Sequence, residues 1–178
     1  MNEKVNRRME IENTERMGCS MEDFKELLKK LNREEEILQF TQFINETAYQ
    51  LGNQILASAL KNQLSLTIDI CRGKQQLFHY AMNGTTKDND EWIKRKNRVV
   101  NRFFHSSYYM AVYYNMLGTT IQEKALLDPT KYAAFGGAFP IIIQNVGVVG
   151  TVTVSGLPHK EDHEFVVGML KEFLQKEV

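Results

Sequence analysis

Two histidines and an aspartate near the carboxyl end of the chain are the residues whose types and spacing best suit chemistry. His159 and His163 lie four positions apart, and Asp162 stands beside the second. A helix would place both imidazoles on one side, at a spacing that metal sites use. His163 with Asp162 is the candidate pair for acid, base or iron-ligand chemistry, because imidazole titrates near neutrality. The simpler interpretation is two exposed histidines at the polar start of a helix.

Two glycine-bearing segments flank the most apolar part of the sequence and suggest a ligand pocket. Glycine lets a ligand approach the backbone closely, and the free N–H groups at a helix start favour an anion. The predicted ligand-binding residues are Gly136, Gly137, Phe139, Ser155 and Gly156. A bend at the glycine pair and a simple helix entry at Ser155 are the structural alternatives.

Several other clusters have a structural explanation that we prefer to a functional one. Helical spacing predicts a solvated or intersubunit face for the basic run Lys94, Arg95, Lys96, Arg98 and Arg102. The cluster Asp88-Asn89-Asp90 is typical of helix capping, with Trp92 packed on the core. A core or oligomer interface is expected for Tyr108, Tyr109, Tyr113 and Tyr114. Hydrolase, kinase and dehydrogenase classes are set aside, because no nucleophile elbow, P-loop or dinucleotide fingerprint is present.

The composition indicates one globular domain and argues against charged macromolecular partners. Of 178 residues, 43% are hydrophobic and 25% charged, and Lys plus Arg equals Asp plus Glu at 22 each. No net field therefore draws the chain to nucleic acid or to a membrane, and we expect neither as a partner. Cys19 and Cys71 form no paired motif, and the first 15 residues contain no apolar segment. A cytoplasmic location is the expectation.

The hydrophobic pattern predicts where the domain and its elements begin. Residues 1–19 are expected to be a polar tail, and residues 20–178 a single domain. Ser20 and Asp23 form a capping-box pattern that starts a helix over 21–32. A brief strand over 35–40 and a long helix from Asn45 follow. Alternation over 64–71 and the apolar residues over 77–80 predict a hairpin.

The second half of the chain completes an α+β domain. A helix starting near Asp88 is expected to continue past Ser106 and Ser107 to Leu117. Residues 138–144 and 148–155 predict a second hairpin, apolar on both faces, which helices must cover. Pro158 opens the final helix. The predicted architecture is a three-layer α/β/α sandwich around a five-stranded antiparallel sheet.

Three blocks of the sequence together resemble a known family. They are NGTTKDNDEWIKRK over 83–96, GGAFPI over 136–141 and GVVGTVTVSGLPHKEDH over 147–163. They are similar to the GlcG/HbpS-like family, also called the haem-degrading domain family, and in particular to its branch of uncharacterised bacterial and fungal proteins. The resemblance covers about residues 21–176. It implies a profilin-like fold, assembly into dimers or larger homo-oligomers, and haem as the cofactor to consider, since some relatives bind haem or iron.

These observations favour a small-ligand-binding domain that acts as a homo-oligomer, with haem or a small anion as the ligand. The first alternative is an enzyme that uses Asp162 and His163 on a small organic acid. The second is a protein-interaction scaffold. The sequence does not decide whether the chain catalyses a reaction, and a resemblance in fold does not supply a site.

Overall fold

A computed structural model describes residues 20–176 of the chain, so the predicted tail over 1–19 lies outside the described residues. The elements run in the order α2 (Met21–Ile37), β1 (Gln39–Phe40), α3 (Asn45–Lys61), β2 (Thr67–Arg72), β3 (Gln75–Ala81), α4 (Lys87–Phe103), α5 (Ser107–Met116), α6 (Ile121–Ala125), β4 (Ala138–Ile143), β5 (Gly147–Ser155) and α7 (His159–Lys176). In this described part, no helix combines the length and the apolar character needed to cross a membrane.

The five strands form one sheet in the order β1-β4-β5-β2-β3. Both predicted hairpins are present as antiparallel pairs, and β2 joins them by pairing antiparallel with β5. The prediction of a purely antiparallel sheet is wrong, because β1 pairs parallel with β4, with Gln39 opposite Ile142. The sheet is therefore mixed, with a two-residue parallel strand at one edge.

The start of α2 agrees with the sequence, but its end does not. Ser20 and Asp23 form the predicted capping box, with the Asp23 carboxylate accepting a hydrogen bond from the Ser20 N–H at 2.8 Å. The helix continues to Ile37 instead of ending at 32, and the strand expected over 35–40 shrinks to two residues. The extra turn is stabilised by Glu34 and Glu35, which are buried and accept hydrogen bonds from distant parts of the chain.

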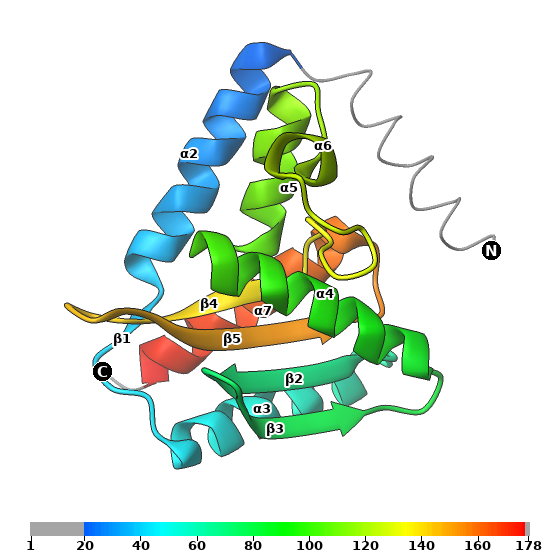
Figure 1. The fold of residues 1–178 in the computed structure, drawn as a ribbon. Helices are drawn as coiled ribbons and strands as arrows, with labels where there is room; N and C mark the ends of the chain where they lie inside the picture. Colours follow the sequence, from blue (N-terminus) through cyan, green and yellow to red (C-terminus); the bar gives the residue numbers. More distant parts are fainter. Residues whose placement is uncertain (1–19, 177–178) are drawn as a thin grey trace.

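The two faces of the sheet are covered by helices of different character, which confirms the three-layer sandwich (Figure 1). Helices α3 and α7 cover an apolar face that includes Ile68, Val152 and Phe139. Helix α4 covers the opposite face, which is polar, with buried side chains of Thr67, Asp69, Thr151, Thr153 and Ser155 and a partly buried Cys71. The prediction that the second hairpin is apolar on both faces is therefore wrong on the α4 side.

Asp69 is the centre of this polar layer. Its carboxylate is almost fully buried and accepts hydrogen bonds from Gln76 at 2.6 Å, Asn97 at 3.0 Å and the Cys71 thiol at 3.2 Å. Burial, together with the charge and hydrogen bond of Asp69, raises the pKa of Cys71 to about 12. The thiol therefore stays protonated at neutral pH and acts as a hydrogen-bond donor.

The single long helix expected from Asp88 to Leu117 is divided into two. Helix α4 ends at Phe103, and Phe104 adopts a left-handed conformation with φ of 60°. Ser106 then caps α5 by accepting a hydrogen bond from the Tyr109 N–H at 3.1 Å, while its own N–H donates to Glu35 at 2.7 Å. The break lets α5 turn away from the sheet and pack beside α2, so the two helices stand together beyond the β1 edge (Figure 1).

A glycine inside α3 sets how closely this helix approaches the sheet, and its substitution tests the packing. A Cβ on Gly52 would overlap the ring of Phe78 on β3, whereas a Cβ on Gly168 of α7 would meet no other atom within 4 Å. We expect Gly52→Ala to lower the free energy of unfolding by about 1–3 kcal/mol through overpacking. Gly168→Ala, the matched control, should raise it by about 0.5–1 kcal/mol through helix propensity. Urea unfolding checks both values, and a Gly52→Ala protein as stable as the control would contradict this account.

Candidate ligand site at the junction of α4 and α7

The predicted glycine pair and the predicted histidines meet at one place. The loop before β4 passes between α4 and the first turn of α7. A Cβ on Gly136 would overlap the carbonyl oxygen of His159 and lie 3.2 Å from the Cβ of His163. We call this region the α4–α7 junction, and it is formed by Trp92, Arg95, Lys96, Phe135, Gly136, Gly137, His159, Asp162 and His163.

Gly137 is fixed by both its conformation and its surroundings. Its φ is +122°, a value that residues with side chains rarely adopt. A Cβ there would lie 2.6 Å from the Nζ of Lys96, 2.6 Å from the carbonyl oxygen of Val154 and 3.0 Å from the Cβ of Asp162. The glycine pair therefore serves close packing among α4, β5 and α7, and the space that its missing side chains leave is filled by the chain itself.

A buried ion pair joins α4 to α7 at this point. The Nζ of Lys96 donates to an Asp162 carboxylate oxygen at 2.9 Å and to the carbonyl oxygen of Val154 at 3.1 Å, and the two charged side chains are 1% and 0% exposed. The other oxygen of Asp162 accepts from the Leu157 N–H at 2.9 Å. The solvated or intersubunit face expected for the basic run is thus wrong for Lys96. Its ammonium binds a carboxylate, and that carboxylate is the chain's own.

Both histidines of the junction are buried, which corrects the expectation of two exposed imidazoles. His163 contacts the Glu34 carboxylate at 3.1 Å, and His159 is 7% exposed. Burial raises the pKa of Glu34, but the hydrogen bond and charge of His163, with the charges of Lys30 and Lys171, outweigh it and lower the pKa below its ordinary value. Glu34 is therefore an ionised acceptor that ties the end of α2 to α7.

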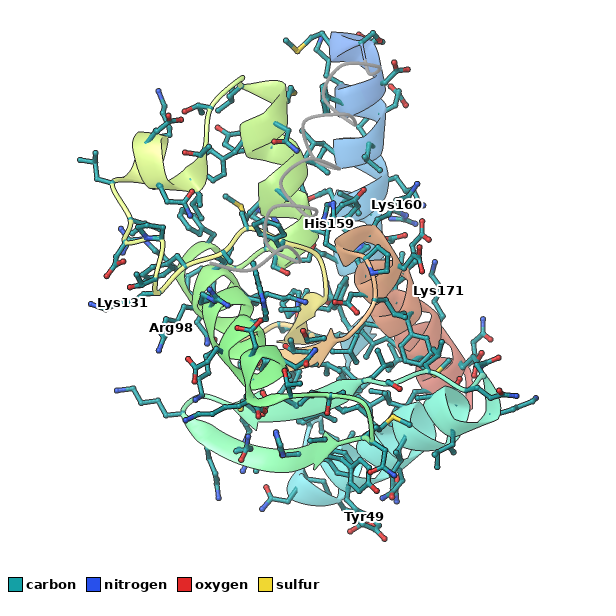
Figure 2. All side chains as sticks on the ribbon, turned by 90° about the vertical axis from the view of Figure 1, so that its right-hand side faces the viewer. Tyr49, Arg98, Lys131, His159, Lys160 and Lys171 are labelled. Atoms are coloured by element: carbon teal, nitrogen blue, oxygen red, sulfur yellow. The ribbon has the colours of Figure 1, made fainter. Side chains whose placement is uncertain are left out.

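A row of aromatic rings leads from this buried pair toward the surface. The ring of Tyr108 lies 5.4 Å from that of His159, His159 lies 5.8 Å from Phe135, and Phe135 lies 5.1 Å from Trp92. The guanidinium of Arg95 stacks over Trp92 at 4.1 Å. Figure 2 shows His159 at the start of α7, below the α2 and α5 pair.

Arg95 is the member of the junction with a cationic group at the surface. Its side chain is 21% exposed; its Nε donates to the Glu91 carbonyl oxygen at 3.2 Å, and the Asp88 carboxylate approaches a terminal nitrogen at 3.8 Å. Our sequence reasoning placed Arg95 in a solvated run and did not single out Phe135. The three-residue spacing of Trp92 and Arg95 on a helix is a signal that could have predicted their stacking, and our sequence analysis did not use it.

The remaining predicted site residues lie behind or beside the junction. Phe139 is fully buried in the apolar core and its ring is 6.2 Å from that of His163. Ser155 is buried beneath α4, and its hydroxyl has no hydrogen-bond partner among the described residues. Gly156 is exposed, and a Cβ there would overlap the carbonyl oxygen of Ser65. The structure thus brings Gly136 and Gly137 close to the histidines, and leaves the other three in supporting positions.

The described residues do not enclose a haem at this junction. The histidines that would bind iron are packed against Tyr108, Phe135 and Phe139. The neighbouring hollow, which Phe135 and Ala134 border, measures about 70 Å³, well below the ~300–1,000 Å³ of sites for drug-sized ligands. Within residues 20–176, no group of three or more His, Cys, Asp or Glu side chains is placed to hold a metal ion.

Comparison with known proteins assigns the chain to a family. The family model described as haem degrading protein HbpS-like matches residues 43–171, and the chain belongs to this family. Among its relatives the chain is similar to the UPF0303 proteins: one from Streptomyces avermitilis is 46% identical over 149 residues, which is 84% of this chain and 91% of the relative. The family resemblance of the three sequence blocks is therefore confirmed.

Solved structures agree with this assignment. The crystal structure of the Ybr137w protein matches with a TM-score of 0.79 and 32% identity, covering 84% of this chain and 88% of that one. A structure of PduOC in complex with haem matches with a TM-score of 0.58, covering 70% of this chain and 89% of that one. At 15% identity, this second similarity shows the shared fold alone.

The buried ion pair offers a direct test of what holds the junction together. We expect Lys96→Met to cost about 3–5 kcal/mol of unfolding free energy, because it leaves the Asp162 carboxylate buried and uncompensated. The double variant Lys96→Met/Asp162→Asn should cost less than the sum of the two single changes, because the neutral amide keeps the bond from Leu157 without a charge. Denaturant unfolding measures all three values.

An exposed pair on the same helix provides the control. Lys94 contacts Glu91 at 2.7 Å, but both side chains are about half exposed. Lys94→Met should therefore cost no more than about 1 kcal/mol. Equal losses for Lys96→Met and Lys94→Met would show that the buried pair does not stabilise the junction.

Proposed function

We propose that this protein is a small-ligand-binding domain whose ligand carries a carboxylate or another small anionic group and binds at the surface of the α4–α7 junction. The family supports a ligand-binding role, because its description names haem and a neighbour of the same fold is a haem complex. The sequence suggested two ligands, haem and a small anion. The geometry of the junction favours the anion.

One observation carries this choice: the Arg95 guanidinium lies over the Trp92 ring, 4.1 Å from its centroid, at a partly exposed position beside the aromatic row. A guanidinium presents five N–H donors in a fixed fork that matches a carboxylate, and stacking holds the fork in place. One of these donors bonds the carbonyl oxygen of Glu91. One terminal nitrogen, Nη2, forms an ion pair with the Asp88 carboxylate at 3.8 Å. An anionic ligand can approach the other terminal nitrogen, Nη1, while Phe135 supplies an apolar wall.

In this proposal the other predicted site residues build the wall and do not react. Gly136 and Gly137 allow the loop to pack on α7, and Phe139 and Ser155 fill the space behind it. Asp162 and His163 are held by Lys96 and Glu34. These contacts fix the position of α7, which carries His159 to the inner end of the aromatic row.

Calorimetry with two simple carboxylates tests the ligand class. Glycolate and benzoate should bind the purified protein, and Arg95→Gln should weaken the better of the two by about ten- to a hundredfold, the loss of one charge-assisted hydrogen-bonding partner at about 1.5–3 kcal/mol. Arg98→Gln is the matched control: Arg98 lies on the same helix but donates to the carbonyl oxygen of Lys131 on the outer side, where Figure 2 shows the two residues together. Its binding should be unchanged.

A haem titration distinguishes the competing ligand. If haem binds at the junction, haemin should shift its Soret band on addition to the wild-type protein. The shift should disappear in His159→Ala and persist in His79→Ala, the control at an exposed histidine. This result would favour haem as the ligand, and it would mean that the junction opens to admit it. Binding of neither carboxylate, or equal losses in Arg95→Gln and Arg98→Gln, would refute the anion site.

A further inference from the structure

The outer face of α3 is unusual in this molecule because it carries no charge along most of its length. The charged residues of this helix stand near its ends, Glu46 and Lys61, and the exposed residues between them are Tyr49, Gln50, Asn53, Ala57 and Leu60. By contrast, the exposed face of α2 carries ion pairs such as Lys25 with Glu22 and Arg33 with Glu36. Depletion of charge around an exposed tyrosine is typical of the centre of a protein interface.

Three apolar residues and one asparagine of α3 follow a helix-pairing spacing. Tyr49, Asn53, Leu56 and Leu60 stand at intervals of four, three and four, which is the seam along which two helices interdigitate. Tyr49 is 58% exposed and Leu60 is 61% exposed. Figure 2 shows Tyr49 on α3 at the lower end of the molecule, far from the α2 and α5 pair. The two ends of the seam are thus exposed, and Leu56 between them is partly buried against the core.

A hollow adjoins the carboxyl end of the seam. It measures about 230 Å³ and is lined by Leu60, Gln63, Leu64, Tyr80, Met82 and Asn83. At about 30 Å³ for each water molecule, it has room for roughly seven or eight waters. That is comparable with the eight non-hydrogen atoms of a tyrosine side chain, the residue type that most often fills such pockets at interfaces, together with Trp and Arg.

We infer that α3 packs antiparallel against α3 of a second copy of this chain, around a two-fold axis between Asn53 and Leu56. This arrangement places Tyr49 of each copy opposite Leu60 of the other, so that each tyrosine enters the hollow of its counterpart. In a two-fold contact, each surface packs against the same surface of the second copy. A face with charges of one sign would repel that copy, whereas the neutral face of α3 has no such repulsion. The contact goes beyond the proposed ligand site, and no residue of the α4–α7 junction lies on α3.

Single charges placed on the seam test the contact. In Tyr49→Glu or Leu60→Lys, each copy would bury a charge against an apolar residue, and the number of subunits measured by light scattering at micromolar concentration should halve. Val146→Glu, which adds a charge at a 71% exposed apolar residue in the β4–β5 turn, is the control and should keep the wild-type mass. Circular dichroism and thermal melts confirm that each variant is folded.

The double variant Tyr49→Glu/Leu60→Lys identifies the antiparallel geometry. Residues 49 and 60 are too far apart along one helix to contact each other, but across the two-fold axis the opposite charges meet, and the assembly should return. Single variants with the wild-type mass, a wild-type chain that runs as a 20.6 kDa monomer, or a double variant as dissociated as the single ones would each overturn the inference. Carboxylate binding measured on the single variants keeps the two proposals separate, because the junction should bind normally in a dissociated but folded chain.

Discussion

The ion pair between Lys96 and Asp162 is the interaction on which the arrangement of the rest depends. Two charges that are 1% and 0% exposed cost several kcal/mol of hydration each, and that cost is offset only when every lone pair and proton is satisfied. Here the carbonyl of Val154 accepts a second hydrogen bond from Lys96, and the N–H of Leu157 donates to the other oxygen of Asp162. The pair therefore fixes α4, the end of β5 and the start of α7 relative to one another, and it leaves room for nothing larger than glycine at position 137.

The sandwich combines two layers with different physical properties. Between the sheet and helices α3 and α7, close apolar packing supplies hydrophobic free energy but little directional information. Between the sheet and α4, hydrogen bonds centred on Asp69 and the Lys96 ion pair set the register of the helix. A polar layer of this kind is expensive unless its groups are paired, so it is sensitive to small displacements. The α4–α7 junction lies at the end of this layer, where a fixed geometry can hold Arg95 and the aromatic row in position.

Local patterns in the sequence were enough for most elements, and long-range contacts explain the failures. The Ser20–Asp23 capping box predicted a helix start correctly, and alternation over 64–71 predicted the strand that the structure has at Thr67–Arg72, because each depends on neighbouring residues. The second face of that strand, expected to be exposed, is buried under α4. The end of α2, the break after Phe103 and the burial of Lys96 depend on His163, Glu35 and Asp162, which are distant in sequence. Hydrophobic periodicity cannot report such partners. The junction was recognised in part, since its glycines and histidines were singled out separately, but nothing local showed that they meet.

The short parallel strand at the edge of the sheet constrains when the domain can be completed. Because Gln39 pairs with Ile142, β1 must wait for a partner about 100 residues further along the chain. At a translation rate of about 5–20 residues per second, that interval is roughly 5–20 seconds. Meanwhile α2 has already been synthesised. Glu35 gains its partners when His105 and Ser106 are made, whereas Glu34 must wait for His163. The apolar side of α2 can pack on α5 as soon as residues 107–116 have been made. The parallel pairing of β1 with β4 and the contact of Glu34 with α7 form later, so the amino-terminal segment is attached to the domain in two steps.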